Sequence, residues 1–156
     1  MERHHLATTI EEVPGFKYMV TVRWSDVDCN GHVRHSAYYD WATTCRLTFL
    51  AENGLSLDEL SVLSIGPVLF REECIFHKEV RLGDEVHICF QLQAARPDFS
   101  RWRFIHHIQK NKKDTAAIVT VEGAWLDTRQ RKLTLPPKKL IEILQLIPKS
   151  SDFVWT

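Results

Sequence analysis

The stretch from Val22 to Tyr39 reads VRWSDVDCNGHVRHSAYY and joins two different patterns in the chain. On its N-terminal side, the β-branched and aromatic residues from Tyr18 to Trp24 predict a strand. At its other end Ser36 is a good N-cap, and the apolar spacing that follows predicts a helix from Ala37 to Glu52. The polar residues 25–35 therefore form a turn-rich loop between a strand and the start of a helix.

The predicted helix carries a wide apolar stripe. Its members recur at helical spacing: Tyr38, Trp41, Ala42, Cys45, Phe49 and Leu50. A helix of about 16 residues is roughly 24 Å long. A stripe with several aromatic side chains must be covered along much of that length. A sheet that wraps around a central helix would provide the cover.

Most of the chain beyond a short linker at 55–64 has strand character. Runs of β-branched and aromatic residues, separated by short turns, predict strands at 68–78, 85–95, 100–110 and 115–126. Short turns imply antiparallel neighbours. An apolar helix is predicted at 138–146, after two prolines. Together with the first strand, the pattern predicts an α+β fold, in which one long helix packs against a five-stranded antiparallel sheet.

Length and composition narrow the class of protein. A chain of 156 residues fits one domain, with its core at 18–147, a flexible N-terminal segment at 1–16 and a tail at 148–156. Lys and Arg together number 20, as do Asp and Glu, so the net charge of zero offers no general case for nucleic-acid binding. The four cysteines contain no C-x-x-C pair, which argues against a zinc site and favours a reducing compartment. Without a long apolar run near the N-terminus, we expect neither a signal peptide nor a membrane span, and a cytoplasmic location.

Four residues that can carry chemistry lie within ten positions at the predicted helix start: Asp26, Asp28, His32 and His35. Carboxylates are common there for structural reasons, because they cap free N–H groups and interact well with the helix dipole. The same place also suits catalysis. The unpaired N–H donors of a first helical turn can bind a carbonyl oxygen that gains negative charge. A carboxylate beside them can attack that carbonyl or activate water, and a histidine can move a proton.

The stretch resembles the start of the 4-hydroxybenzoyl-CoA-thioesterase-like hot-dog proteins. Their signature is a strand, then D-x-D-x-x-G-[HIV]-V, then the central helix, and residues 26–33 match it. The similarity continues in order through Arg46, Leu82-Gly83-Asp84, Ser100 and Pro136, and covers residues 18–147. The resemblance implies a hot-dog fold, in which a long central helix is wrapped by a five-stranded antiparallel sheet.

The resemblance also assigns roles. The second Asp of the signature is the catalytic carboxylate of the family, and it falls on Asp28. The bacterial acyl-CoA thioesterases associated with the Tol-Pal cluster have in addition a histidine seven positions later, which here is His35. The chain departs from the family where acidic residues often precede the helix arginine, because here Thr43, Thr44 and Cys45 precede Arg46.

The implied activity is hydrolysis of an acyl-CoA thioester at the start of the helix. Asp28 would be the nucleophile, giving a mixed anhydride, or the general base for water, and His35 would orient the water or help the thiolate leave. Gly31, His32 and Ser36 would shape the pocket for the carbonyl oxygen. Weaker candidates for substrate binding are Arg34, Tyr38, Ser100, Arg101 and Lys112. Coenzyme A enters only as part of the substrate, and no metal or other cofactor is implied.

Family sites form at a subunit boundary, so the resemblance implies a homodimer or a dimer of dimers. Two other functions stay open. MaoC-type enoyl-CoA hydratases use a D-x-N-P-x-H segment, but Gly31 replaces its proline and His32 comes one residue early. The second alternative is a non-catalytic protein that binds acyl-CoA or acyl-carrier protein.

Three further expectations concern structure. Asp26 is interpreted as a turn or cap residue. One of His106 and His107, in an alternating strand, should face inward as a hydrogen-bonded sheet histidine. The apolar tail at 153–155 should fold back onto its own domain or pack on a neighbouring subunit.

Overall fold

The computed structural model describes residues 13–112 and 114–156. In that part of the chain the strands are β1 (Phe16–Val20), β2 (Ile65–Phe76), β3 (Val86–Ala95), β4 (Arg101–Lys110), β5 (Asp114–Asp127), β6 (Lys132–Thr134) and β7 (Lys149–Trp155). The helices are α1 (His35–Glu52), α2 (Leu57–Val62) and α3 (Lys138–Leu144), and a 3₁₀ turn, η1 (Trp24–Asp26), precedes α1.

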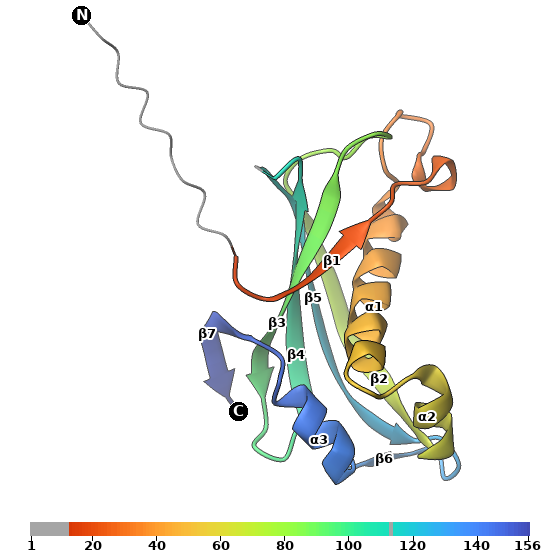
Figure 1. Ribbon diagram of the computed structural model, residues 1–156, viewed down its shortest axis with the longest axis vertical. Helices are drawn as coiled ribbons and strands as arrows, with labels where there is room; N and C mark the ends of the chain where they lie inside the picture. The colour runs from red at the N-terminus through yellow and green to blue at the C-terminus, as the bar shows by residue number, and fades with distance from the viewer. Residues whose placement is uncertain (1–12, 113) are drawn as a thin grey trace, which may run out of the picture.

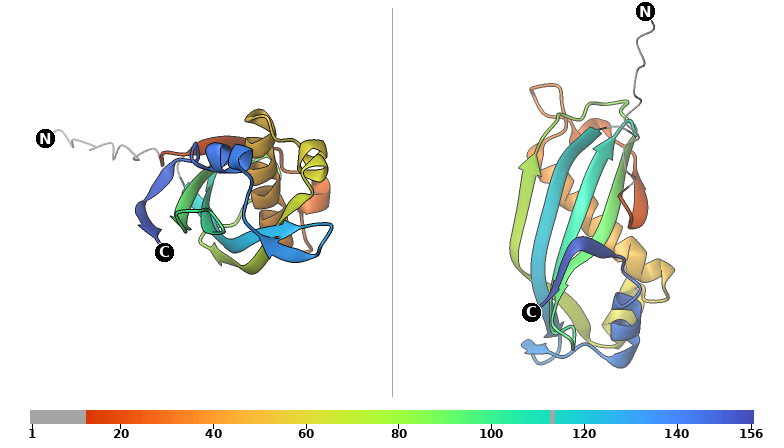
Figure 2. Two further views of the ribbon diagram at one scale, coloured as in Figure 1. Left: turned by 90° about the horizontal axis from the view of Figure 1, so that it is seen from below. Right: turned by 90° about the vertical axis from the view of Figure 1, so that its left-hand side faces the viewer.

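The strands form one sheet in the order β1-β3-β4-β5-β2, with β6 added to β5 and β7 added to β3. All neighbouring pairs are antiparallel except β3 and β7, which are parallel. Helix α1 lies along one face of this sheet, and α2 and α3 lie at the end where α1 finishes (Figures 1 and 2). The architecture is therefore α+β, as predicted.

The core forms where the apolar stripe of α1 meets the central strands. The whole predicted stripe of α1 is buried. Phe49 meets Phe90 of β3 with ring centroids 5.6 Å apart, and Phe90 meets Phe104 of β4 at 5.2 Å, both edge to face. Edge-to-face pairs add about 0.5–1.5 kcal/mol to what burial alone contributes. This packing of α1 against β3 and β4 supports the loops at the ends of the sheet.

The predicted count of five strands wrapped around a central helix was wrong. The sheet has seven strands, and α1 packs along one face of it. The two additional strands gave no signal in the sequence. β6 has only three residues and is largely exposed, and β7 carries polar residues in its first half, so neither shows a strand-like alternation.

Two local boundaries were also wrong. The predicted strand at 18–24 ends at Val20, because Trp24 to Asp26 turn into η1, where the Asp26 carboxylate accepts a hydrogen bond from the Arg23 N–H at 2.8 Å. The predicted linker at 55–64 contains α2, which starts with a capping box between Ser56 and Glu59. That Ser-x-x-Glu pattern is a recognised helix start and was present in the sequence.

The structure describes the C-terminal end of the chain but not residues 1–12 at the N-terminal end. The expectation of a flexible segment at 1–16 falls largely on residues 1–12, which lie outside the described residues. The apolar tail folds back onto its own domain as β7, where Trp155 meets Phe99 at 6.0 Å and the Thr156 N–H donates to the Ala95 carbonyl.

Several loops, including the one that carries Asp28, lie together at one end of the sheet. The 21–34 loop, the start of α1, the 77–85 loop and the hairpin between β4 and β5 all lie there, at the top of Figure 1. The turn between β3 and β4 lies at the opposite end.

Candidate functional site

The segment from Asp28 to His32 is a tight, self-bonded loop. The Asp28 N–H donates to the His32 carbonyl at 3.0 Å, and the Gly31 N–H donates to the Asp28 carbonyl at 3.1 Å. Gly31 has a φ of +81°, a left-handed conformation that favours glycine. A bridge between Val27 and Val33 closes the loop at its base. The backbone therefore presents Asp28 and His32 side by side.

The Asp28 carboxylate is held through one of its two oxygens. Its Oδ1 accepts a hydrogen bond from the Asn30 N–H at 2.8 Å and lies 4.0 Å from Nδ1 of His32. The side chain is 29% exposed, so the carboxylate is supported by the loop and still reachable. Both of these contacts fall on the same oxygen, Oδ1.

A cavity of about 310 Å³ opens beside this carboxylate. Its lining comes from the signature loop (residues 26–33), the start of α1, and the end of β2 with the loop that follows it. The lining residues are Asp28, His32, Val33, His35, Tyr38, Phe76, His77, Lys78 and Glu79. The structure thus brings Asp28, His32 and His35 together in one cavity, with Tyr38 at its wall. A volume of this size is within the range of small-molecule sites.

Helix α1 begins beside the same cavity, which its first-turn residues His35 and Tyr38 line. Arg34 occupies the N-cap position with extended backbone, and no side chain caps the helix. The prediction that Ser36 caps the helix was therefore wrong, because the helix already begins at His35 and Ser36 Oγ accepts a hydrogen bond from the Arg34 guanidinium. N–H groups without a capping side chain are suited to stabilise negative charge that develops on an oxygen.

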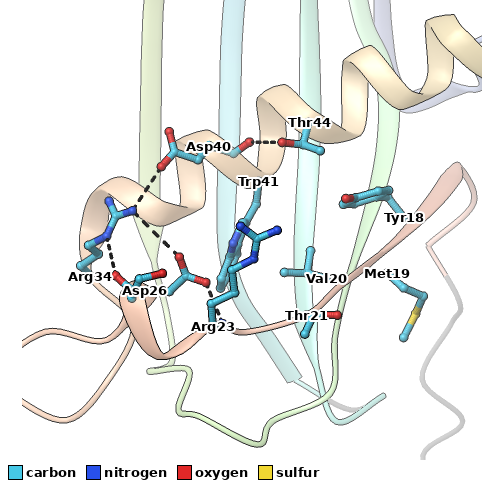
Figure 3. A pocket seen from close by; sticks show the side chains of 11 residues that line it. Tyr18, Met19, Val20, Thr21, Arg23, Asp26, Arg34, Asp40, Trp41 and Thr44 are labelled. Carbon is cyan, nitrogen blue, oxygen red and sulfur yellow. Dashed lines mark hydrogen bonds and ion pairs between the residues drawn. The ribbon is translucent and has the colours of Figure 1, made fainter.

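Arg34 anchors the start of α1 on the side away from the cavity. Its guanidinium lies between Asp26, at 3.9 Å, and Asp40, at 3.4 Å, as Figure 3 shows. The backbone N–H of Arg34 donates a hydrogen bond to the backbone carbonyl of Asp26 at 2.7 Å. These residues line a second, polar cavity of about 350 Å³ between α1 and β1. Asp26 is buried and makes turn and ion-pair contacts, which confirms its structural interpretation.

Tyr38 and Phe76 form an aromatic wall of the site, and Trp41 packs against Tyr38. The Tyr38 ring meets Phe76 at 5.2 Å and Trp41 at 5.3 Å. Burial, with a smaller contribution from Cys74, raises the pKa of Tyr38 to about 12, against a lowering hydrogen bond from the Val80 backbone. Its hydroxyl therefore stays protonated at neutral pH and cannot serve as a base.

The buried Cys45 and the half-buried Cys74 are poorly suited to act as nucleophiles. Desolvation by burial raises the pKa of the Cys45 thiol to about 12 and that of the Cys74 thiol to about 11. A thiol with so high a pKa carries almost no thiolate at pH 7.

The remaining predicted residues lie in two places. Lys112 is in the β4–β5 hairpin at the cavity end of the sheet, where its Nζ lies 3.6 Å from the Glu85 carboxylate. Ser100 and Arg101 lie at the start of β4, at the opposite end, where Arg101 stacks over the Phe70 ring. A single chain therefore does not bring Ser100 or Arg101 to the cavity around Asp28.

Besides Val33 of the signature segment, the sequence did not predict four lining residues, namely Phe76, His77, Lys78 and Glu79. They come from a segment about 50 positions downstream that bears no motif of its own. The backbone bond from the Val33 N–H to the Val80 carbonyl, at 2.7 Å, holds that segment beside the signature loop. Only the long-range pairing reveals their place.

His106 is the inward-facing member of the predicted histidine pair. It is fully buried, and its Nδ1 lies 3.0 Å from the Val119 carbonyl oxygen. Burial, assisted by the nearby Arg46 guanidinium, lowers its pKa to about 3. The interpretation of a satisfied sheet histidine is confirmed.

Residues 13–112 and 114–156 were searched for membrane-spanning helices and for clusters of metal-binding side chains. None of the helices there has the length and hydropathy to span a bilayer. Nor do the side chains in these two ranges form a group of three or more His, Cys, Asp or Glu residues fit to hold a metal ion.

Comparisons with known proteins agree with this architecture. The family described as the thioesterase-like superfamily matches residues 22–144. A protein of Aquifex aeolicus (strain VF5) that bears an esterase name is 23% identical over 130 residues, which are 83% of this chain and 98% of that protein.

Two solved structures illustrate the likeness of fold. A Staphylococcus aureus protein crystallised in complex with CoA superposes with a TM-score of 0.76 and 19% identity, over 89% of each chain. A 1,4-dihydroxy-2-naphthoyl-CoA thioesterase from Synechocystis superposes with a TM-score of 0.76 and 16% identity, over 85% of this chain and 97% of that one. Likeness at this level of identity concerns the fold.

Proposed function

The chain belongs to the thioesterase-like superfamily, and from that premise we propose that it hydrolyses an acyl-CoA thioester to a free acid and CoA. One observation carries the proposal. The Asp28 carboxylate, held through Oδ1, borders a cavity that is also lined by His35, the first residue of α1, whose N-terminus has no side-chain cap. A carboxylate and an array of N–H donors are the two groups that attack on a thioester carbonyl requires.

In this mechanism the thioester carbonyl oxygen sits at the first turn of α1, whose N–H groups stabilise the charge that develops on it. Asp28 Oδ2 either attacks the carbonyl carbon or takes a proton from an attacking water. In the first case an oxygen–carbon bond forms, the carbon–sulfur bond breaks, and the leaving thiolate takes a proton. Water then hydrolyses the mixed anhydride and regenerates the carboxylate.

His35 is the second member of the proposed catalytic pair. It is the first residue of α1 and lines the same cavity as Asp28. From this position its imidazole can orient the attacking water or give a proton to the thiolate. The seven-residue spacing from Asp28 to His35 also supports the Tol-Pal-associated branch of the family. We expect the His35→Ala variant to lose about 10²-fold in kcat, the usual contribution of a general acid or base.

The substrate carrier is proposed as coenzyme A on the strength of the relatives. A structural neighbour was crystallised with CoA, and another is named as a thioesterase for an aromatic acyl-CoA.

We further propose that the active form is a homodimer, alone or paired into a dimer of dimers, formed through β2. This strand lies at one edge of the sheet, with its outer backbone groups available for pairing. Several large apolar side chains on it are about half exposed: Leu69, Phe70, Ile75 and Phe76. Phe76 also lines the cavity, so a partner on β2 would lie next to the site.

A thiol-release assay on short, medium, long and aromatic acyl-CoAs tests the proposed function. We expect thiol release on at least one class, with the free acid appearing in equal amount by mass spectrometry. Loss of the crotonyl-CoA double bond without thiol release would instead favour a hydratase. Tight acyl-CoA binding in calorimetry with no turnover on any substrate would favour a binding protein.

A further inference from the structure

We propose that Glu79 is a positioning residue, which holds the His32 imidazole against Asp28 and so fixes the orientation of the reacting carboxylate. This role rests on the proposed thioesterase function of the Asp28 site. It extends that function to a residue outside the signature segment.

The inference starts from the placement of the His32 ring between two carboxylates. Its Nδ1 lies 4.0 Å from Asp28 Oδ1, and its Nε2 lies 3.8 Å from Glu79 Oε2. Both distances are within ion-pair range, and all three residues line the same cavity. Each ring nitrogen therefore faces a different carboxylate, at a distance longer than a hydrogen bond, so the ring is flanked by acidic groups at both edges.

Glu79 is itself firmly placed. Its Oε1 accepts hydrogen bonds from the Arg81 guanidinium, at 2.9 Å from Nε and 2.5 Å from Nη2, which leaves Oε2 turned toward His32. Its carbonyl accepts a hydrogen bond from Lys110 Nζ at 2.6 Å. The neighbouring Val80 carbonyl is bonded to the Val33 N–H, directly after His32. The 77–85 loop and the signature loop thus form one unit.

The consequence for chemistry lies at Asp28. With the Asn30 N–H and the His32 ring both on the Oδ1 side, the carboxylate is oriented so that Oδ2 is the oxygen offered to the thioester. Without Glu79 the ring keeps only one of its two restraints, and the fraction of time that Asp28 spends in the reactive orientation falls. Reaction rates are sensitive to such small losses of alignment.

Glu79 contributes little to folding, because its side chain is 44% exposed and that of His32 is 34% exposed. The Glu79→Ala variant should therefore fold with an unchanged melting temperature. We expect its kcat to fall about 10-fold with KM unchanged, the size of loss typical when the outer partner of a functional imidazole is removed. The Glu79→Gln variant, which keeps an oxygen of the same reach, should recover part of the loss.

A double-mutant cycle separates this role from a direct one. If Glu79 acts through His32, Glu79→Ala should add no further loss in a His32→Ala background. The matched control is Glu142→Ala, an exposed glutamate on α3 that pairs with Lys138 away from both the cavity and β2, which should leave kcat and KM unchanged. An equal loss from Glu79→Ala with and without His32 would overturn the proposal.

The second readout needs no substrate. In NMR spectra, the His32 ring signals should move in the Glu79→Ala variant and stay in place in the Glu142→Ala variant. Ring signals unchanged by Glu79→Ala would show that the contact does not form, and would overturn the inference. If the wild-type protein released no thiol from any acyl-CoA, the proposed function would fail, while the ring signals would still decide whether Glu79 holds His32.

Discussion

The His106 imidazole lies inside the sheet, stacked on the Phe90 ring at 5.1 Å and bonded through Nδ1 to the Val119 carbonyl. Its Nε2 lies 3.4 Å from the Arg46 guanidinium, whose own pKa burial lowers. A proton added to the ring would be buried beside a positive charge. The fold therefore holds His106 in its neutral form.

This environment makes stability depend on pH. The pKa of His106 is lowered to about 3 in the folded protein, whereas the unfolded chain has an ordinary value near 6.5. Below pH 6.5 the unfolded state binds a proton that the folded state does not, so stability falls as pH falls from about 6.5 toward 3. The expected slope from this group is about 1.4 kcal/mol per pH unit.

Urea unfolding of the wild-type protein and the His106→Gln variant at pH 7.5, 6.5 and 5.5 measures this slope. The variant should lose less stability than the wild type over that range, because it has no proton to take up at this position. Parallel pH dependence of the two proteins would contradict the account.

At the residue scale, the sequence predicted the residues whose role depends on near neighbours. Asp28, His32 and His35 lie within eight positions, so the geometry of one loop and one helix start brings them together. Glu79 reaches the same cavity only because the Val33 N–H bonds to the Val80 carbonyl. That contact depends on tertiary structure, and no local pattern announces it.

At the scale of elements, the junction between η1 and α1 decides where the loop that carries Asp28 lies. Asp26 is buried there, accepts a hydrogen bond from the Arg23 N–H and lies 3.9 Å from the Arg34 guanidinium. Asp40 contacts the same guanidinium but is exposed (Figure 3). The two carboxylates therefore contact one arginine at different depths.

The Asp26→Ala variant should lose about 1–3 kcal/mol of unfolding free energy, because it removes the buried carboxylate that accepts the Arg23 N–H and faces Arg34. The matched Asp40→Ala variant should lose less than about 1 kcal/mol, as exposed ion pairs do. Urea denaturation of both variants beside the wild type measures the difference. Equal losses would mean that the junction is not held through Asp26.

Elements with a strong period were predicted well, and those without one were not. The predicted helix at 37–52 and the strands β3, β4 and β5 agree with the structure to within about two residues, because each buries one face against the core. The start of α1 was misplaced because the backbone of Arg34, and not the side chain of Ser36, opens the helix. β7 could not be predicted because its pairing with β3 follows from the path of the whole chain.

At the scale of the whole molecule, the edge strand β2 differs from the interior strands in how much apolar surface it exposes. Its apolar side chains Leu69, Phe70, Ile75 and Phe76 are about half exposed, whereas the apolar side chains of β3 are buried. The sequence patterns of the two strands do not reveal this difference, since edge position is a property of the assembled sheet.

The proposed dimer predicts that Ile75→Lys shifts the protein toward the monomer, because a charge then lies on the surface that a partner would bury. Sedimentation velocity measures the shift, and kcat should fall with it. The control is Leu135→Lys, at an apolar residue that is exposed at least as much as Ile75 and lies outside β2, which should leave the sedimentation coefficient unchanged. A wild-type protein that sediments as a monomer at all concentrations would contradict the proposed assembly.

The most direct test of the central claim is the turnover rate of the Asp28→Asn variant on the best acyl-CoA. This substitution keeps the size of the side chain and an acceptor for the Asn30 N–H, so the loop should keep its shape. Thiol release should fall by at least about 10²-fold, with the circular dichroism spectrum and melting temperature unchanged. Near-normal turnover by a folded Asp28→Asn protein would show that Asp28 is not the working carboxylate.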